Sequence, residues 1–181
     1  SVQKAMPGQL TVDWCYFSLH QVNHDGASSW RIWDQPSIDE GWQERNYATS
    51  LRSFWAAEAA RRQGMDAFQQ YHIALLRARY AQGLSLAAPE TVHLVAREVG
   101  LDMAQFQESI HDPSCLQRLA SDYTRADEID VFGTPTFVFP GAVPAYLKLS
   151  QLPESEEGLA FWREFHQIVA GRPFVQEIKR P

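Results

Sequence analysis

The chain has 181 residues, 45% of them apolar, and a formal net charge of −6. This length and apolar content allow a full core in one domain, or in a domain with a large insertion. The negative charge and the lack of an arginine or lysine run argue against a nucleic acid as partner. No apolar stretch approaches the roughly 18 residues of a membrane span, so we expect no membrane segment.

Two cysteines, Cys15 and Cys115, lie a hundred residues apart and form no CxxC pair. This is not a disulfide framework, and it favours a cytoplasmic protein. We expect Cys15 to be buried in a strand as a small apolar residue. Cys115 stands near a predicted helix start, which can lower a thiol pKa, but we favour an inert packing residue. The six histidines show no ligand spacing, so we expect no metal site.

The first 47 residues predict a strand and a long loop. Residues 1–8 resemble the last turn of a helix, which a Pro-Gly pair stops. Residues 10–17 alternate apolar and polar positions before becoming aromatic, which predicts a β-strand. Residues 18–47 show no period, and no helix is expected directly after Cys15. Their three tryptophans either line a ligand pocket or fix the loop to the protein body, and we favour the second.

The pattern from residue 48 to about 128 is helical, and it predicts a compact all-helical subdomain. Five helices are expected, at about 48–64, 66–82, 89–100, 102–112 and 114–128. Pro89 and Asp102 mark two of the starts, and Gly64, Gly83 and Gly100 mark three of the ends.

The remaining residues predict a hairpin and a helix. Residues 134–149 contain two short β-branched and aromatic runs around a Pro-Gly turn, which predicts a β-hairpin. A C-terminal helix is expected after Pro153, with an acidic first turn that suits the helix dipole, and it ends near Gly171.

Gly133, Thr134 and Pro135 stand directly before the first strand of this hairpin. Proline is tolerated at the start of a strand, and a cis X-Pro bond costs only about 0.5–1 kcal/mol. A cis bond at Thr134–Pro135 turns the backbone of Thr134 outward as an unpaired edge for recognition. The alternative is an ordinary junction between a loop and a strand.

The order of these elements resembles the thioredoxin-fold proteins of the DsbA class, in particular the branch with FrnE-like oxidoreductases and 2-hydroxychromene-2-carboxylate isomerases. Residues 10–19 are similar to the second strand of that branch and the loop after it, 66–106 to its helical insertion, and 133–138 to its cis-proline loop. Where relatives usually have glycine, this chain has Asp130, which tolerates a left-handed turn.

The resemblance implies an α/β fold with a thioredoxin-like sheet and an inserted all-α subdomain. The thioredoxin-like domain comprises residues 1–47 and 129–181, and the helical insertion comprises residues 48–128. In this family, a first strand leads to a CxxC, or to a serine in the isomerases, and no such segment is present in this chain. We therefore expect the catalytic residues upstream of Ser1.

The first strand of a thioredoxin-like sheet lies between the second strand and the cis-proline strand. Without it, residues 9–17 and the 134–149 hairpin expose open edges, and an isolated hairpin is marginally stable. We expect residues upstream of Ser1 to supply this strand. The alternative is a strand from a second chain, as in a homodimer.

The resemblance implies thiol–disulfide exchange, with a protein or small-thiol disulfide as substrate and no bound cofactor. Gly133, Thr134 and Pro135 then bind the substrate main chain. The alternative is an isomerase or transferase with glutathione as co-substrate and an aromatic pocket, for which the candidates are Phe17, Trp30 and Trp33. A third alternative is a redox-inactive module that only binds peptides.

Overall fold

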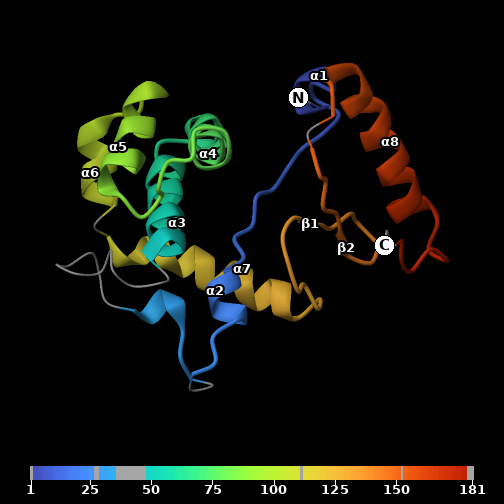
Figure 1. The fold of residues 1–181 in the computed structure, drawn as a ribbon, viewed down its shortest axis with the longest axis horizontal. Coiled ribbons are helices and arrows are strands. Elements are labelled where there is room, and N and C mark those ends of the chain that lie inside the picture. Colours follow the sequence, from blue (N-terminus) through green and yellow to red (C-terminus); the bar gives the residue numbers. More distant parts are fainter. Residues whose placement is uncertain (1, 27–28, 36–47, 111, 152, 179–181) are drawn as a thin grey trace. The chain divides into compact units, whose positions relative to one another are not determined.

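The computed structural model describes residues 2–26, 29–35, 48–110, 112–151 and 153–178. The chain divides into two compact units (Figure 1). The helical unit comprises residues 16–124, and the C-terminal unit comprises residues 1–15 together with 125–181. These limits differ from the predicted domain boundaries at 47/48 and 128/129, which remain a prediction about the family's domain organisation.

All five predicted helices of the helical unit are present. In chain order, the described elements of this unit are α2 (Leu19–Val22), η1 (Ile32–Asp34), α3 (Ala48–Arg61), α4 (Met65–Tyr80), α5 (Pro89–Glu98), α6 (Met103–Ser109), η3 (Pro113–Leu116) and α7 (Gln117–Asp127). The predicted fifth helix thus begins as a 3-10 turn and continues as α7. The Asp102 side chain caps α6 by accepting the N–H groups of Ala104 and Gln105, at 2.9 and 3.0 Å.

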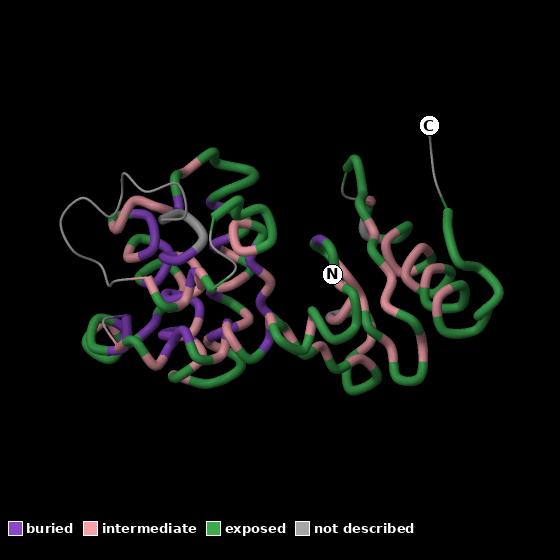
Figure 2. The backbone as a smooth tube through the Cα atoms, turned by 90° about the horizontal axis from the view of Figure 1, so that it is seen from below, coloured by how far each residue is buried: buried purple, intermediate pink, exposed green. Residues whose placement is uncertain are grey.

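The core of the helical unit forms where α3 packs against α4, α5 and α6. Its largest buried side chains include Trp55, Phe68, Tyr71 and Phe106, and Figure 2 shows the buried residues concentrated in this unit. The polar tips are satisfied: the Trp55 indole N–H donates to the Asp112 carbonyl at 2.8 Å, and the Tyr71 hydroxyl donates to the Val92 carbonyl at 3.1 Å. Burial of these rings therefore leaves neither polar group without a hydrogen-bond partner.

A buried carboxylate joins the first residue of the helical unit to α7. Asp122 is 2% exposed, and its Oδ2 accepts the backbone N–H of Tyr16 at 3.0 Å. The Arg118 Nε donates to both carboxylate oxygens at 2.9 Å. The negative charge of Asp122 is thus compensated by a cation and used to satisfy a buried backbone donor.

A second cluster lies between α3 and α4. The Arg61 guanidinium lies 3.6 Å from the centre of the Phe68 ring, and the His72 ring stacks on Phe68 at 5.5 Å. Burial, and to a smaller extent the charge of Arg61, lowers the pKa of His72 from its ordinary 6.5 to about 4. His72 is therefore neutral at pH 7.

In the C-terminal unit, β1 (Thr136–Phe137) pairs antiparallel with β2 (Ala145–Tyr146), which confirms the predicted hairpin with shorter strands. The helix α8 (Ser155–Gly171) carries Trp162 and Phe165, whose rings lie 5.2–6.0 Å from those of Phe137 and Phe139. The short helix α1 (Val2–Ala5) also packs against α8. Among the described residues of this unit, only Gly133 is buried.

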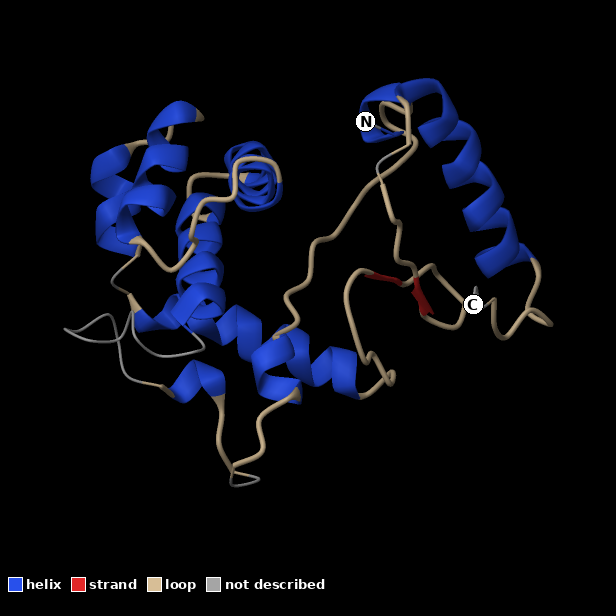
Figure 3. Cartoon of the chain, viewed as in Figure 1, coloured by secondary structure: helices blue, strands red, loops and turns tan. Residues whose placement is uncertain are grey.

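The predicted strand over residues 10–17 is wrong, because this segment is extended but belongs to no sheet (Figure 3). The alternation itself is present: Leu10, Val12 and Trp14 are half-buried, and the residues between them are exposed. A strand needs a neighbour for its hydrogen bonds, and the sheet of the described residues consists of β1 and β2 alone.

Two further expectations about this region are corrected. Cys15 is exposed rather than buried, because it falls on the outward side of the alternation. The helix α2 begins four residues after Cys15, where Ser18 caps it by accepting the Gln21 N–H at 3.2 Å. The cap at Ser18 thus stabilises one helical turn, which the spacing of the apolar residues did not predict.

We expect Asp122→Ala to lower the free energy of unfolding by about 2–3 kcal/mol, because it leaves the buried Tyr16 N–H without its acceptor. Asp127→Ala is the matched control, since Asp127 is exposed on the same helix, and it should change stability by less than about 0.5 kcal/mol. Urea unfolding followed by tryptophan fluorescence measures both. Equal losses in the two variants would contradict the role of Asp122.

We expect protonation of His72 to destabilise the helical unit in mild acid. Because its pKa is lower in the folded protein than in the unfolded chain, the unfolded chain binds more protons between about pH 6.5 and 4. As the pH falls from about 6.5 to 4, the free energy of unfolding therefore decreases by up to about 3 kcal/mol. Above pH 6.5, His72 is neutral in both states and this loss of stability is absent. In His72→Gln this slope should flatten when urea unfolding is measured at several pH values. A variant with the unchanged slope would refute the assignment.

Candidate functional site

The Thr134–Pro135 loop lies between the end of α7 and β1, and its peptide bond between these two residues is cis. Hydrogen bonds hold the loop on both sides of this bond. The Thr136 hydroxyl donates to the Gly133 carbonyl at 2.7 Å, and the Leu147 N–H donates to the Pro135 carbonyl at 3.1 Å. The loop is thereby attached to the strand that it precedes and to the chain that follows β2.

Gly133 is buried against the ring of Tyr146. A Cβ atom at position 133 would lie 3.3 Å from the Tyr146 Cε2, which is closer than ordinary contacts. The Phe132 ring lies against the same tyrosine, with 5.2 Å between ring centres. Tyr146 thus supports the loop from β2, and a small residue at position 133 lets the backbone approach it. This supporting role of Tyr146 has no local signal in the sequence.

Thr134 itself is exposed, as is Pro135. Within the described residues, neither the N–H nor the carbonyl of Thr134 forms a hydrogen bond. An unpaired donor and acceptor on an exposed residue can pair with an extended chain, as in β-strand addition. The loop therefore has the geometry to hold a main chain, and it brings no reactive group of its own.

The segment that leads into the loop turns at Asp130, which has a φ of +56°. This left-handed residue follows α7, and the Val131 N–H donates to the Ala126 carbonyl at 2.9 Å to close the helix end. The sequence-based expectation that an aspartate adopts this turn is confirmed.

The three aromatic pocket candidates belong to the helical unit and fall into two groups. Phe17 stacks on Tyr123 at 5.5 Å, and Trp33 packs on the same ring at 5.4 Å. Trp30 instead stacks on His24, with 3.8 Å between ring centres. Trp33 thus fixes its segment to α7, as favoured, while a pocket role for the three residues remains a prediction. Trp42 lies outside the described residues.

A glutamine side chain holds the same segment in place. The Gln21 amide donates to the Trp30 carbonyl at 3.1 Å, and its oxygen accepts the Ile32 N–H at 2.8 Å. Ile32 is fully buried. Trp30 and Ile32 are therefore held by contacts to a residue about ten positions earlier, which the missing apolar period did not reveal.

The two cysteines differ in exposure. Cys115 is buried, and its thiol donates to the Ser109 carbonyl at 3.2 Å. Burial raises the pKa of this thiol to about 11, which confirms the inert packing residue. Cys15 is exposed. The helix that follows Cys15, α2, has only four residues and is too short to stabilise a thiolate.

The part of the chain that the structure describes contains no cluster of three or more histidine, cysteine, aspartate or glutamate residues suited to a metal ion. In the same residues, no helix has the length and apolar character required to cross a membrane.

The chain belongs to the family described as the DSBA-like thioredoxin domain, which matches residues 38–154. This membership confirms the predicted family and the α/β fold class with a helical insertion. The chain is 24% identical over 172 residues to uncharacterized protein Rv2286c of Mycobacterium tuberculosis. The matched segment covers 95% of this chain and 70% of that protein.

Two other similar proteins carry the name ClpXP adapter protein SpxH. The SpxH of Halalkalibacterium halodurans is 26% identical over 123 residues, or 66% of this chain and 40% of the relative. The SpxH of Shouchella clausii is 31% identical over 84 residues, or 46% of this chain and 28% of the relative. The chain thus spans less than half the length of both SpxH proteins.

We expect the two thiols to react with iodoacetamide at very different rates in the native protein. Cys15 should be alkylated first because it is exposed, whereas Cys115 should stay unmodified until the helical unit unfolds. Peptide mass spectrometry after timed alkylation, with and without urea, measures this order. Equal labelling of both cysteines without urea would contradict it.

Proposed function

We propose that the protein takes part in thiol–disulfide exchange of the DsbA class, within its FrnE-like branch. The Thr134–Pro135 loop, with Gly133, holds the main chain of the disulfide partner. The observation that carries this proposal is the exposed backbone of Thr134, whose N–H and carbonyl form no hydrogen bond in the described residues. Family membership supports the fold on which such chemistry takes place.

The reaction needs a thiolate beside the held main chain. The thiolate attacks one sulfur of the partner disulfide, a mixed disulfide forms, and the electron pair leaves on the other sulfur as a thiolate. A second cysteine then resolves the mixed disulfide, so that the protein is oxidised as its partner is reduced. We assign both thiols to a CxxC upstream of Ser1, because Cys115 is buried and Cys15 has no long helix beside it. Cys15 and Cys115, which form no disulfide with each other, suit a reducing cytoplasm.

A redox-inactive binding protein is the second candidate. It is favoured by the similarity to two proteins named ClpXP adapter protein, since an adapter acts by binding another protein. In this case the loop would hold a partner's main chain without any exchange of disulfides. The two candidates share the binding step and differ only in the chemistry that follows.

The test is reduction of insulin by the full-length protein in the presence of dithiothreitol, followed by turbidity. Thr134→Pro removes the backbone donor without removing a hydrogen bond from the described fold. We expect this variant to slow the reaction about tenfold, because the complex with the partner loses one hydrogen bond. Thr134→Ala is the matched control, since it keeps the backbone N–H, and it should stay within about twofold of the wild type.

A second measurement protects this test against a folding defect in Thr134→Pro. In the wild type, hydrogen exchange at the Thr134 amide should slow when the protein is trapped as a mixed disulfide with a peptide. Unchanged exchange there would contradict main-chain binding. No turnover of insulin, together with slowed exchange on peptide binding, would favour the adapter. Saturable glutathione binding without thiol exchange would instead favour the isomerase alternative.

A further inference from the structure

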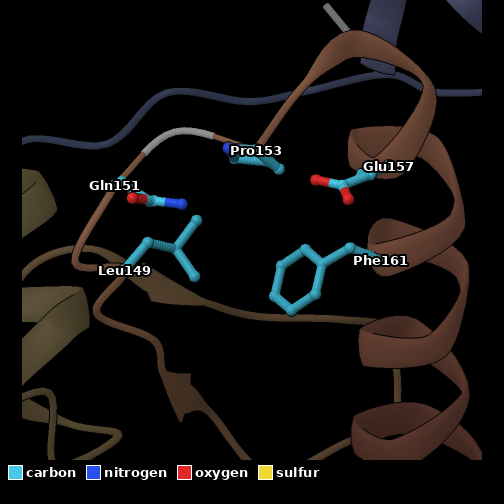
Figure 4. Close-up of a pocket in the computed structure, with 5 residues that line it drawn as sticks. All are labelled: Leu149, Gln151, Pro153, Glu157 and Phe161. Carbon is cyan, nitrogen blue, oxygen red and sulfur yellow. The ribbon is translucent and has the colours of Figure 1, made fainter.

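A pocket of about 210 Å³ lies within the C-terminal unit, at the start of α8 (Figure 4). It is lined by Leu149, Gln151, Pro153, Glu157 and Phe161. None of these residues belongs to the Thr134–Pro135 loop, and none has a role in the proposed thiol exchange.

The pocket combines apolar walls with two polar groups. Leu149, Pro153 and Phe161 supply the apolar surface, and Figure 4 shows the Gln151 amide and the Glu157 carboxylate pointing into the space from opposite sides. Glu157 and Phe161 are one helical turn apart, so the carboxylate and the ring share one face of α8. A ligand on the Phe161 ring therefore reaches the carboxylate directly.

The charge of the pocket lining favours a cation, because Glu157 is the only charged residue among the described residues that line it. Glu154 and Glu156 stand near it in the sequence, and Lys148 and Arg163 lie just outside the lined segment. The N-terminus of α8 offsets only part of this charge, because a helix dipole is equivalent to about half of one positive charge. An anion is thus disfavoured at this helix start, although such positions often bind anions.

The size of the pocket favours a side chain over a whole cofactor or drug-sized ligand. Sites for such ligands usually enclose about 300–1,000 Å³, and this pocket is smaller. Lysine and arginine combine an apolar stem with a cationic head. Arginine fits better, since its planar group can stack on an aromatic ring and donate two hydrogen bonds to one carboxylate.

We propose that this pocket binds an arginine side chain of a partner protein or peptide. The stem lies on Leu149 and Phe161, the guanidinium donates to the Glu157 carboxylate, and the neutral Gln151 amide closes the opposite side. This binding adds side-chain recognition to the protein, and it does not depend on thiol chemistry.

The test is an NMR titration of the full-length protein with N-acetyl-arginine amide, compared with N-acetyl-citrulline amide, which has the same length but no charge. We expect millimolar binding of the arginine probe, with shift changes at the Gln151 side-chain amide and at Leu149. The citrulline probe should bind about three- to fivefold more weakly, as expected for an exposed ion pair. Raising the salt concentration should reduce this preference.

Glu157→Gln should abolish the preference for arginine over citrulline. Glu156→Gln is the matched control, because it removes the same charge one residue away in α8 and outside the pocket lining. Phe161→Leu keeps the carboxylate and should weaken both probes alike. Any one of three results would overturn the proposal: equal affinity for the two probes, equal effects of the two glutamate variants, or the absence of shift changes at Gln151.

Discussion

An extended backbone satisfies its N–H and carbonyl groups only when a second strand lies beside it, whereas a helix satisfies them within its own segment. This difference separates the two units of the chain. The helical unit completes its hydrogen bonds along α3 to α7 and buries Trp55, Phe68 and Tyr71. In the C-terminal unit, β1 and β2 have two residues each, and large side chains such as Phe132 and Val143 are 69% and 81% exposed.

The same difference explains how much of the fold could be predicted from the sequence. Helix boundaries depend on residues close in the chain, so Pro89, Asp102 and Gly100 indicated them correctly. The hairpin could also be predicted, because its two strands are joined by a short turn. Residues 10–17 carry the alternation of a strand, but whether a strand forms depends on a distant neighbour that no local pattern reveals. The exposure of Cys15 follows from its place on the outward side of this alternation.

The candidate site could be predicted only in its local part. Gly133, Thr134 and Pro135 are adjacent in the sequence, and their pattern indicated an outward backbone edge. The contacts that support them come from Tyr146 and Leu147, which lie more than ten residues away. Likewise, the Tyr123 ring packs against Phe17 and Trp33, which lie about a hundred residues earlier in the chain. Backbone recognition at Thr134, as proposed, would accept many sequences, while a side-chain pocket at Glu157 would discriminate among them.

The link between Tyr16 and Asp122 has a consequence for the order of folding. It joins residues 106 positions apart, so a long loop must close before it forms, whereas α3 and α4 are joined by only three residues. The entropy of closing a loop rises slowly with its length, by about 0.6 kcal/mol per doubling, but it must be lost before the contact stabilises anything. We therefore expect the α3–α4 hairpin to form early and the Tyr16–Asp122 bond to form after the transition state. Such a late bond governs how slowly the native protein unfolds more than how fast it folds.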